Sequence, residues 1–156
     1  MAIRKIVKVP DPILKEKASE VTKFNARLHK LLDDMAETMY DAPGVGLAAP
    51  QVGISKRVIV LDDGEGLIEA INPVLSNQTG EQIEPPEGCL SIPNLLGTVR
   101  RAERVRVKAQ DRHGKPFEKE VDGYLARIFQ HEVDHLEGVL FTDIADRVFD
   151  PRDEGE

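Results

Sequence analysis

Hydrophobic positions divide the first half of the chain into one helix and two strands. Between residues 24 and 39, apolar side chains recur every three or four positions, which predicts an amphipathic helix that ends before "DAPG" at 41–44. The β-branched run "RVIVL" at 57–61 predicts a strand. "LIEAINP" at 67–73 predicts another, which is expected to end before Pro73 because proline has no N–H for a sheet ladder.

A hairpin is predicted in the second half. Polar and apolar residues alternate at 104–109, the pattern of an antiparallel strand with one exposed face. "FEKEV" at 117–121 can return beside it after a turn at 111–116. By contrast, "EPPEGC" at 84–89 predicts an irregular loop, because its two prolines remove hydrogen-bond donors and its glycine loosens the backbone.

The last helix is expected from about Gly123 to Glu137, with Asp122 as N-cap and Gly138 as its stop. Helix, strands and helix follow one another without a βαβ repeat. We therefore expect the α+β class, with antiparallel strands packed around the C-terminal helix and an N-terminal amphipathic helix beside them. The length of 156 residues suits a single domain over 1–148, and the acidic tail at 149–156 is expected to be disordered.

Composition narrows the class of protein. Acidic residues number 28 against 21 lysines and arginines, and the net charge of -7 argues against a direct nucleic-acid function. The single cysteine, Cys89, excludes an intrachain disulfide, and residues 1–12 lack the apolar core of a signal peptide. No apolar run approaches the ~20 residues that cross a bilayer, so we expect a cytoplasmic protein that does not contact membranes.

Two histidines in "QHEVDHLEG" at 130–138 form a candidate metal site. His131 and His135 lie four apart and would share one helix face, while Glu132 is rotated away and could act on a metal-activated water as general base. The alternative is an ordinary solvated helix face. Apolar residues flank the pair on both sides, which favours buried imidazoles, and buried polar groups need partners.

A third ligand is expected from upstream. Zinc proteases of the metzincin type place another histidine six residues after the second one, but Phe141 stands there. Cys89 is the candidate, because it lies in a loop bounded by proline and glycine; the alternative is a small buried hydrophobe. One cysteine and two histidines would leave a fourth position open, as in a catalytic site.

Glycines in "GVGLAAPQVG" at 44–53 would let the backbone approach a ligand or another segment closely. Gln51 follows them as an uncharged donor. The alternative is a tight turn after the first helix, and the spacing does not match a phosphate-binding loop.

Together, "GVGLAAPQ" (44–51), "EGCLS" (87–91) and "QHEVDHLEG" (130–138) resemble the three motifs of the peptide deformylases, in order and spacing. The resemblance covers roughly Ile6 to Phe141. It implies a metal-dependent catalytic domain that removes the formyl group from N-terminal formylmethionine of new polypeptides and releases formate.

The resemblance also implies roles for individual residues. Three match the family's metal ligands: Cys89, His131 and His135. Glu132 matches the catalytic acid/base, Gln51 and the backbone N–H of Leu90 match the donors that hold the formyl oxygen, and the backbone of Gly46 matches a substrate-positioning group. The family commonly uses Fe(II), with Zn(II), Ni(II) or Co(II) as possible substitutes.

A pocket for the methionine side chain is expected from residues near His131. Tyr124 and Ile128 lie on its helix face, and Val45 could complete the wall. Arg127 lies on that face too, but we expect it to extend into solvent, as long cationic side chains commonly do.

Substrate and partners follow from the same resemblance, with two departures. Leu96 stands where some relatives have an arginine that grips the peptide, so strand pairing along 44–46 is expected to contribute more. The acidic tail cannot dock on the ribosome as the basic C-terminal helix of some relatives does, so at most a transient ribosome contact is expected. The partners are N-formylmethionyl peptides.

Two rival functions stay open at this point. A metal-dependent peptidase or amidase could use the same histidines and Glu132 on unformylated peptides. A non-catalytic relative could bind nascent chains without turnover, although a purely structural metal site would need neither Glu132 nor Gln51.

Overall fold

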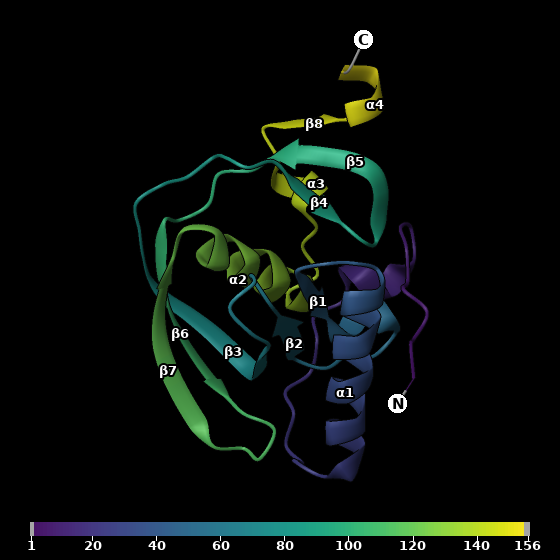
Figure 1. The fold of residues 1–156 in the computed structure, drawn as a ribbon, viewed down its shortest axis with the longest axis vertical. Helices are drawn as coiled ribbons and strands as arrows, with labels where there is room; N and C mark the ends of the chain where they lie inside the picture. The colour runs from purple at the N-terminus through teal and green to yellow at the C-terminus, as the bar shows by residue number, and fades with distance from the viewer. Residues whose placement is uncertain (1, 155–156) are drawn as a thin grey trace.

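A five-stranded antiparallel sheet with a helix on each face forms the body of the molecule (Figure 1). The computed structural model describes residues 2–154. The sheet has the order β1-β2-β3-β6-β7, with these bounds: β1 Gly46–Ala48, β2 Val58–Leu61, β3 Ile68–Thr79, β6 Arg104–Gln110 and β7 Pro116–Asp122. The two long helices are α1, Ala26–Asp41, and α2, Gly123–Leu136.

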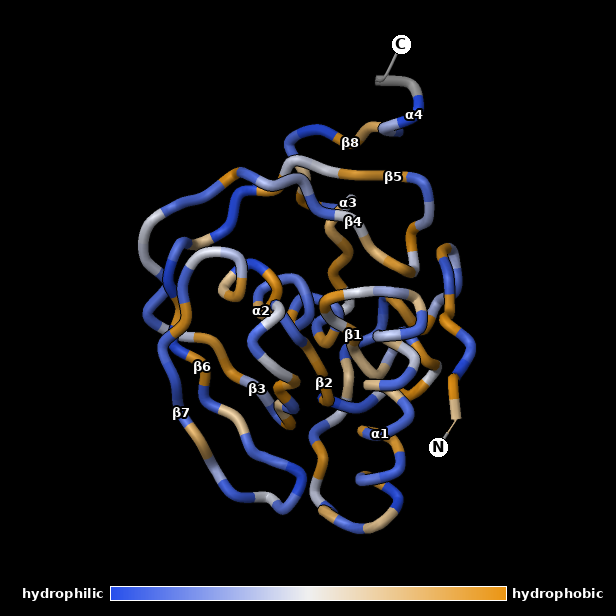
Figure 2. The backbone as a smooth tube through the Cα atoms, in the orientation of Figure 1, coloured by the Kyte–Doolittle hydropathy of each residue, from blue (hydrophilic) through white to orange (hydrophobic). Residues whose placement is uncertain are grey.

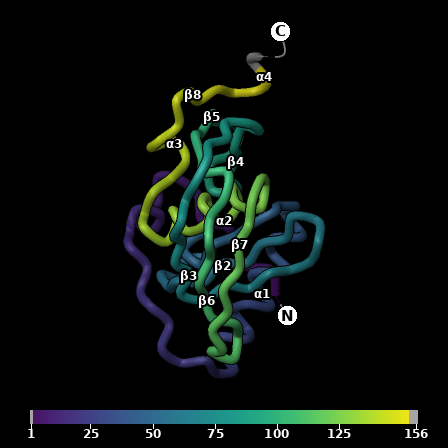
Figure 3. Tube along the Cα trace, turned by 90° about the vertical axis from the view of Figure 1, so that its left-hand side faces the viewer, coloured from purple at the N-terminus to yellow at the C-terminus, as the bar shows by residue number. Residues whose placement is uncertain are grey.

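A second, three-stranded antiparallel sheet lies at the end of the molecule that carries the C-terminus (Figures 1 and 3). It has the order β4-β5-β8, with these bounds: β4 Glu87–Cys89, β5 Ile92–Thr98 and β8 Arg147–Phe149. Four short helical turns complete the chain: η1 Pro12–Lys15, η2 Ala49–Val52, α3 Phe141–Ile144 and α4 Pro151–Glu154. The α+β class with antiparallel sheets and a C-terminal helix is therefore confirmed.

Strand β2 separates the two main parts of the core. Val58 and Val60 pack into the cluster that contains α1, whereas Ile59 and Leu61 pack into the cluster that contains α2. Successive side chains of a strand point to opposite faces, so α1 and α2 cover opposite faces of the sheet. This explains the uninterrupted apolar run of β2, which lies inside the molecule while the β6–β7 hairpin is largely hydrophilic (Figure 2).

Two local expectations were wrong. Strand β3 does not end before Pro73 but continues to Thr79, because a register shift between Ile71 and Val74 takes the proline out of the regular ladder. The segment 84–89 is not wholly irregular, because its last three residues form β4. The prolines lie just before that short edge strand, where their missing donors are not needed.

The hairpin and the last helix agree with the sequence pattern. Strands β6 and β7 pair in register from Arg104 with Asp122 to Gln110 with Pro116. Asp122 is the N-cap of α2, but its side chain makes no capping hydrogen bond. Among the described residues, no helix combines the length and apolar character that a bilayer span requires.

The boundary proposed at residue 148 stays a prediction. Phe149 ends β8 opposite Leu96, and residues 151–154 form α4. Residues 155 and 156, the end of the expected disordered tail, lie outside the described residues.

Gly138 ends α2 in a left-handed conformation with φ 77°. Its N–H donates to the His135 carbonyl, and the Val139 N–H donates to the Asp134 carbonyl, so the last turn is closed by backbone bonds. A Cβ at Gly138 would lie 2.5 Å from the Lys15 carbonyl oxygen. The helix end therefore packs directly against the backbone of η1.

We predict that Gly138→Ala destabilises the protein by at least about 1 kcal/mol more than Gly53→Ala, because overpacking adds to the strain of a positive φ. Gly53 is the matched control: its φ is 83°, but a Cβ there would meet only one atom, Val7 Cγ2 at 3.9 Å. Urea unfolding of both variants measures the difference. Equal losses of unfolding free energy would show that the contact with Lys15 has no energetic weight.

Candidate metal centre and active site

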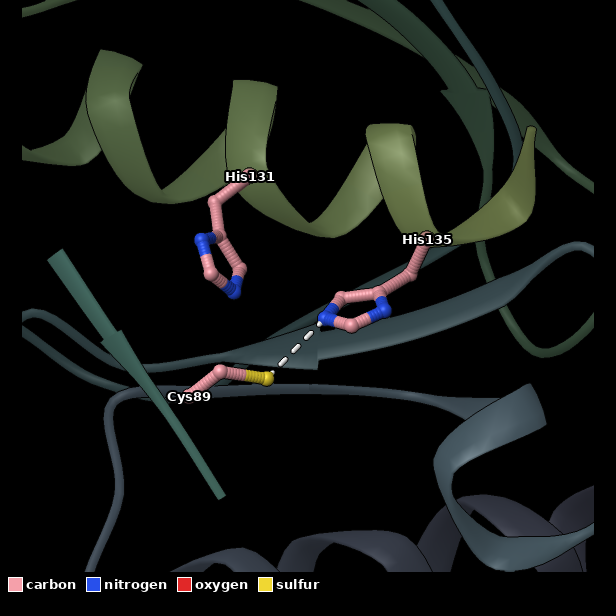
Figure 4. A group of neighbouring side chains, drawn as sticks. All are labelled: Cys89, His131 and His135. Carbon is pink, nitrogen blue, oxygen red and sulfur yellow. Dashed lines mark hydrogen bonds between the residues drawn. The ribbon is translucent and has the colours of Figure 1, made fainter. Parts of the chain in front are cut away.

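Three side chains from two elements converge on one point (Figure 4). His131 and His135 project from successive turns of α2, and Cys89 ends β4. One ligand atom of each lies within 4.8 Å of the others, and Cys89 Sγ is 3.3 Å from His135 Nε2. Donors that hold one ion at about 2.0 to 2.3 Å lie some 3 to 4 Å apart, so the group fits a single divalent ion.

Both imidazoles are nearly buried, as the apolar flanks of the helix indicated: His131 is 9% exposed and His135 1%. His131 Nδ1 lies 2.9 Å from Glu87 Oε1, which leaves Nε2 for an ion. Burial lowers the pKa of His135 well below its usual range, and the charges of His131 and Arg101 add to the effect. His135 is therefore neutral, the form that ligates metals.

Glu87 is a functional residue that sequence reasoning missed. Its carboxylate is buried and accepts two hydrogen bonds from Arg101, both of 2.8 Å, besides the contact with His131. Burial opposes ionisation, but hydrogen bonds from Arg101 and His131 outweigh it and lower the pKa of Glu87 to about 2. Glu87 thus stays a charged acceptor that orients the ring of His131.

The expectation that Arg127 extends into solvent was wrong. Its side chain is 2% exposed and donates to Glu87 Oε2 at 2.6 Å. The buried carboxylate supplies the partner that water would otherwise provide, so the guanidinium stays inside.

Glu132 lies beside the ligands, packed against the backbone of β1. It is 4% exposed, and burial raises its pKa to about 7. A Cβ at Gly46 would lie 2.5 Å from Glu132 Oε2. The second glycine of "GVG" is therefore required by the carboxylate, which refines the expectation of a close approach at this position.

Gln51 reaches the same site from η2 and is 1% exposed. The Ala48 N–H donates to Gln51 Oε1 at 3.0 Å, so the amide nitrogen points the other way. That nitrogen donates to Ser91 Oγ at 3.2 Å and contacts Cys89 Sγ at 3.5 Å. A rigid, uncharged donor therefore faces the ligand group.

A cavity of about 400 Å³ opens onto these groups. Its lining includes all the expected catalytic and pocket residues: Val45, Gly46, Gln51, Leu90, Tyr124, Ile128 and Glu132. Val45 is 41% and Tyr124 45% exposed, so these two border the opening, whereas Ile128 is buried at 4%. The structure thus brings these residues, which are distant in sequence, around one cavity.

Comparison with known proteins gives the family. The profile of the family described as polypeptide deformylase matches residues 3–149. This chain belongs to that family. It is 58% identical to a peptide deformylase of Pelotomaculum thermopropionicum over 95% of both chains, and 55% identical to one of Symbiobacterium thermophilum over 100% of this chain and 73% of the other.

Solved deformylase structures agree in fold. The crystal structure of the peptide deformylase from Thermotoga maritima superposes with a TM-score of 0.91 at 44% identity, covering 93% of this chain and 99% of that one. The deformylase of Synechococcus elongatus in complex with actinonin gives 0.85 at 42% identity, covering 91% and 78%. Membership of the polypeptide deformylase family thus rests on sequence and fold together.

We predict that the metal-free protein loses stability between pH 4.5 and 7 because of Glu132. Its pKa is raised from 4.5 to about 7, so over this range the unfolded chain releases the proton while the folded chain keeps it. The contribution is present below pH 4.5 and lost as pH rises through 7, amounting to about 3 kcal/mol.

Chemical unfolding of chelator-treated wild type and Glu132→Gln across this range measures the effect. Glu132→Gln should become progressively more stable than wild type as pH rises. Glu118→Gln is the control: a hydrogen bond from Arg106 lowers the pKa of Glu118, so this carboxyl titrates below the range and the difference from wild type should stay nearly constant across it. A pH-independent difference for Glu132→Gln would contradict the raised pKa.

Proposed function

We propose that this chain removes the formyl group from the N-terminal formylmethionine of nascent polypeptides and releases formate. The observation that carries the proposal is the placement of a general base and an amide donor beside an N₂S ligand group in one cavity. Membership of the polypeptide deformylase family supports the same reaction.

Cys89, His131 and His135 would hold one divalent ion, which would lower the pKa of a water molecule and polarise the formyl carbonyl. Glu132 takes the proton of that water and passes it to the leaving amine, which would otherwise depart as an unstable anion. Burial raises the pKa of Glu132 in the metal-free protein, and a nearby cation would lower it again, which suits a carboxyl that accepts and returns a proton near neutral pH.

Gln51 and the backbone N–H of Leu90 donate to the formyl oxygen as negative charge develops on it. The Ala48 N–H holds the amide of Gln51 in place before substrate arrives, so its reorganisation costs little. Such preorganised donors favour the transition state over the ground state.

Substrate binding is assigned to the cavity and to the edge of the sheet. Val45, Tyr124 and Ile128 would enclose the methionine side chain. Gly46 begins β1, which is an edge strand, so its outer side can pair with an extended peptide. Leu96 also lines the cavity and offers an apolar contact there.

Fe(II) is the proposed native ion, with Zn(II), Ni(II) and Co(II) as substitutes, because a thiolate and two imidazoles suit all four. We further propose that the protein acts in the cytoplasm on chains emerging from the ribosome. Any ribosome contact would be transient, because the tail after residue 148 carries more acidic than basic residues.

We predict that the protein, prepared anaerobically with about one divalent ion per chain, releases formate from formyl-Met-Ala-Ser and leaves acetyl-Met-Ala-Ser intact. Glu132→Ala should retain the ion and lose at least about 100-fold in kcat, since general acid–base catalysis contributes that much. Formate assays with metal analysis on the same samples measure both.

Glu118→Ala is the matched control, because Glu118 lies on the exposed hairpin and pairs only with Arg106 among the ion pairs of the described residues. It should keep wild-type turnover. Cleavage of unformylated peptides would favour a peptidase, and bound metal without formate would favour a binding protein.

We predict that air exposure abolishes formate release by the Fe(II) form. Ferrous iron is oxidised by oxygen, and a thiolate such as Cys89 can be oxidised as well. Comparing Fe(II)-loaded and Ni(II)-loaded protein before and after aeration separates the causes: loss in the iron form alone locates the damage at the ion, and loss in both locates it at Cys89. Full activity of both forms after aeration would contradict the prediction.

A further inference from the structure

Arg127 makes contacts that metal binding alone does not explain. Besides Glu87, its guanidinium donates to the Val99 carbonyl at 3.1 Å and to the Gln82 carbonyl at 3.2 Å. These acceptors lie outside α2, on the segments that surround the second sheet. One buried cation therefore ties the metal-binding helix to β4 and to two neighbouring stretches of backbone.

The spacing of Arg127 and His131 on α2 connects this contact to the candidate metal site. Arg127 and His131 lie four apart on α2 and so share one face. They hold different oxygens of the same carboxylate, Arg127 at Glu87 Oε2 and His131 at Glu87 Oε1. The carboxylate thus spans one turn of the helix and cannot rotate without losing one of the two bonds.

Strand β4 carries both Glu87 and the third ligand. Glu87 and Cys89 are two residues apart, and both side chains contact α2, Glu87 at His131 and Cys89 at His135, although the β4–β5 register shifts between them. Holding Glu87 against α2 therefore also sets how far Cys89 lies from His131 and His135. The strand is only three residues long, so few other backbone bonds fix its position.

Arg101 reinforces the same junction from another segment. It binds both oxygens of Glu87 and also Asp134 on α2, and its side chain is 5% exposed. Because Arg101 is a second partner of Glu87, replacing Arg127 does not leave a bare buried carboxylate. What Arg127 alone adds is the link from that carboxylate to the Val99 and Gln82 carbonyls.

We propose that Arg127 is a positioning residue that aligns β4 with α2 through Glu87, so that Cys89 meets the two histidines at ion-binding distance. The inference rests on the proposed function only in taking these three residues as metal ligands. It assigns to Arg127 a role in metal affinity, distinct from contact with the substrate.

The test is the dissociation constant for Co(II), measured by competition with a chelator on folded, metal-stripped protein. Arg127→Met, which keeps the length of the side chain but neither charge nor donors, should weaken Co(II) binding about 10- to 100-fold, the usual effect of losing a partner behind a metal ligand. Arg127→Lys should fall between this variant and wild type, because an ammonium group cannot reach all three acceptors.

Arg106→Met is the matched control. Arg106 is 40% exposed and pairs with Glu118 and Glu120 on β7, so its replacement should change the Co(II) constant by less than about twofold. The Co(II) absorption bands of Arg127→Met should also shift, because the thiolate and the imidazoles are no longer held in one arrangement.

A double-mutant cycle separates positioning from bulk stability. In the Glu87→Gln background, adding Arg127→Met should weaken Co(II) binding by less than about twofold further, because the shared carboxylate is already gone. If Arg127→Met and Arg127→Lys bind Co(II) as wild type does while melting at lower temperature, Arg127 is structural only and the proposal is overturned.

Failure of the proposed function looks different. If the wild-type protein neither binds Co(II) nor releases formate, the assignment of the metal site is wrong, and this inference is wrong with it. If the wild-type protein does both and the Arg127 variants bind Co(II) with unchanged affinity, only the positioning role of Arg127 is refuted.

Discussion

A buried carboxylate that must stay charged is the constraint on which the site depends. An isolated carboxylate in the interior costs several kcal/mol, and Glu87 is tolerated there because Arg101, Arg127 and His131 all bind it. These partners come from α2 and from the segment that follows β5. Satisfying one charge therefore fixes how the second sheet sits on α2.

A second constraint is the absence of a side chain at Gly46. The backbone of β1 comes so close to Glu132 that any Cβ would overlap the carboxylate. This closeness keeps Glu132 out of water and raises its pKa, and it also places the edge of the sheet next to the ligands. The burial of Glu132 and the position of this sheet edge thus both depend on one glycine.

Much of this was visible in the sequence. Helical spacing put His131 and His135 on one face, and the flanking apolar residues indicated burial. Cys89 was a candidate third ligand from its loop alone, with a small buried hydrophobe as the alternative, and the resemblance of three motifs favoured the ligand and added the donor roles. Nothing local in a chain shows which distant loop a helix face will meet.

What the sequence could not show are the contacts that depend on tertiary placement. Arginine is usually found at the protein surface. Arg127 is buried because Glu87, from the other sheet, supplies a buried carboxylate to pair with it. Pro73 stops a regular ladder, but a register shift that no local pattern reveals lets β3 continue. In both cases a partner distant in sequence overrides the local preference.

The balance of charges connects the buried network to the chemistry. Arg101 and Arg127 carry two positive charges, which the carboxylates of Glu87 and Asp134 balance. A divalent ion would bring two further charges, and the thiolate of Cys89 would offset only one. Glu132 is the nearest remaining carboxyl among the cavity-lining residues, and a neighbouring cation would favour its ionised form against the burial that now raises its pKa. In the proposed mechanism, loading the ligand group would therefore make Glu132 readier to accept a proton, so turnover would depend on metal occupancy.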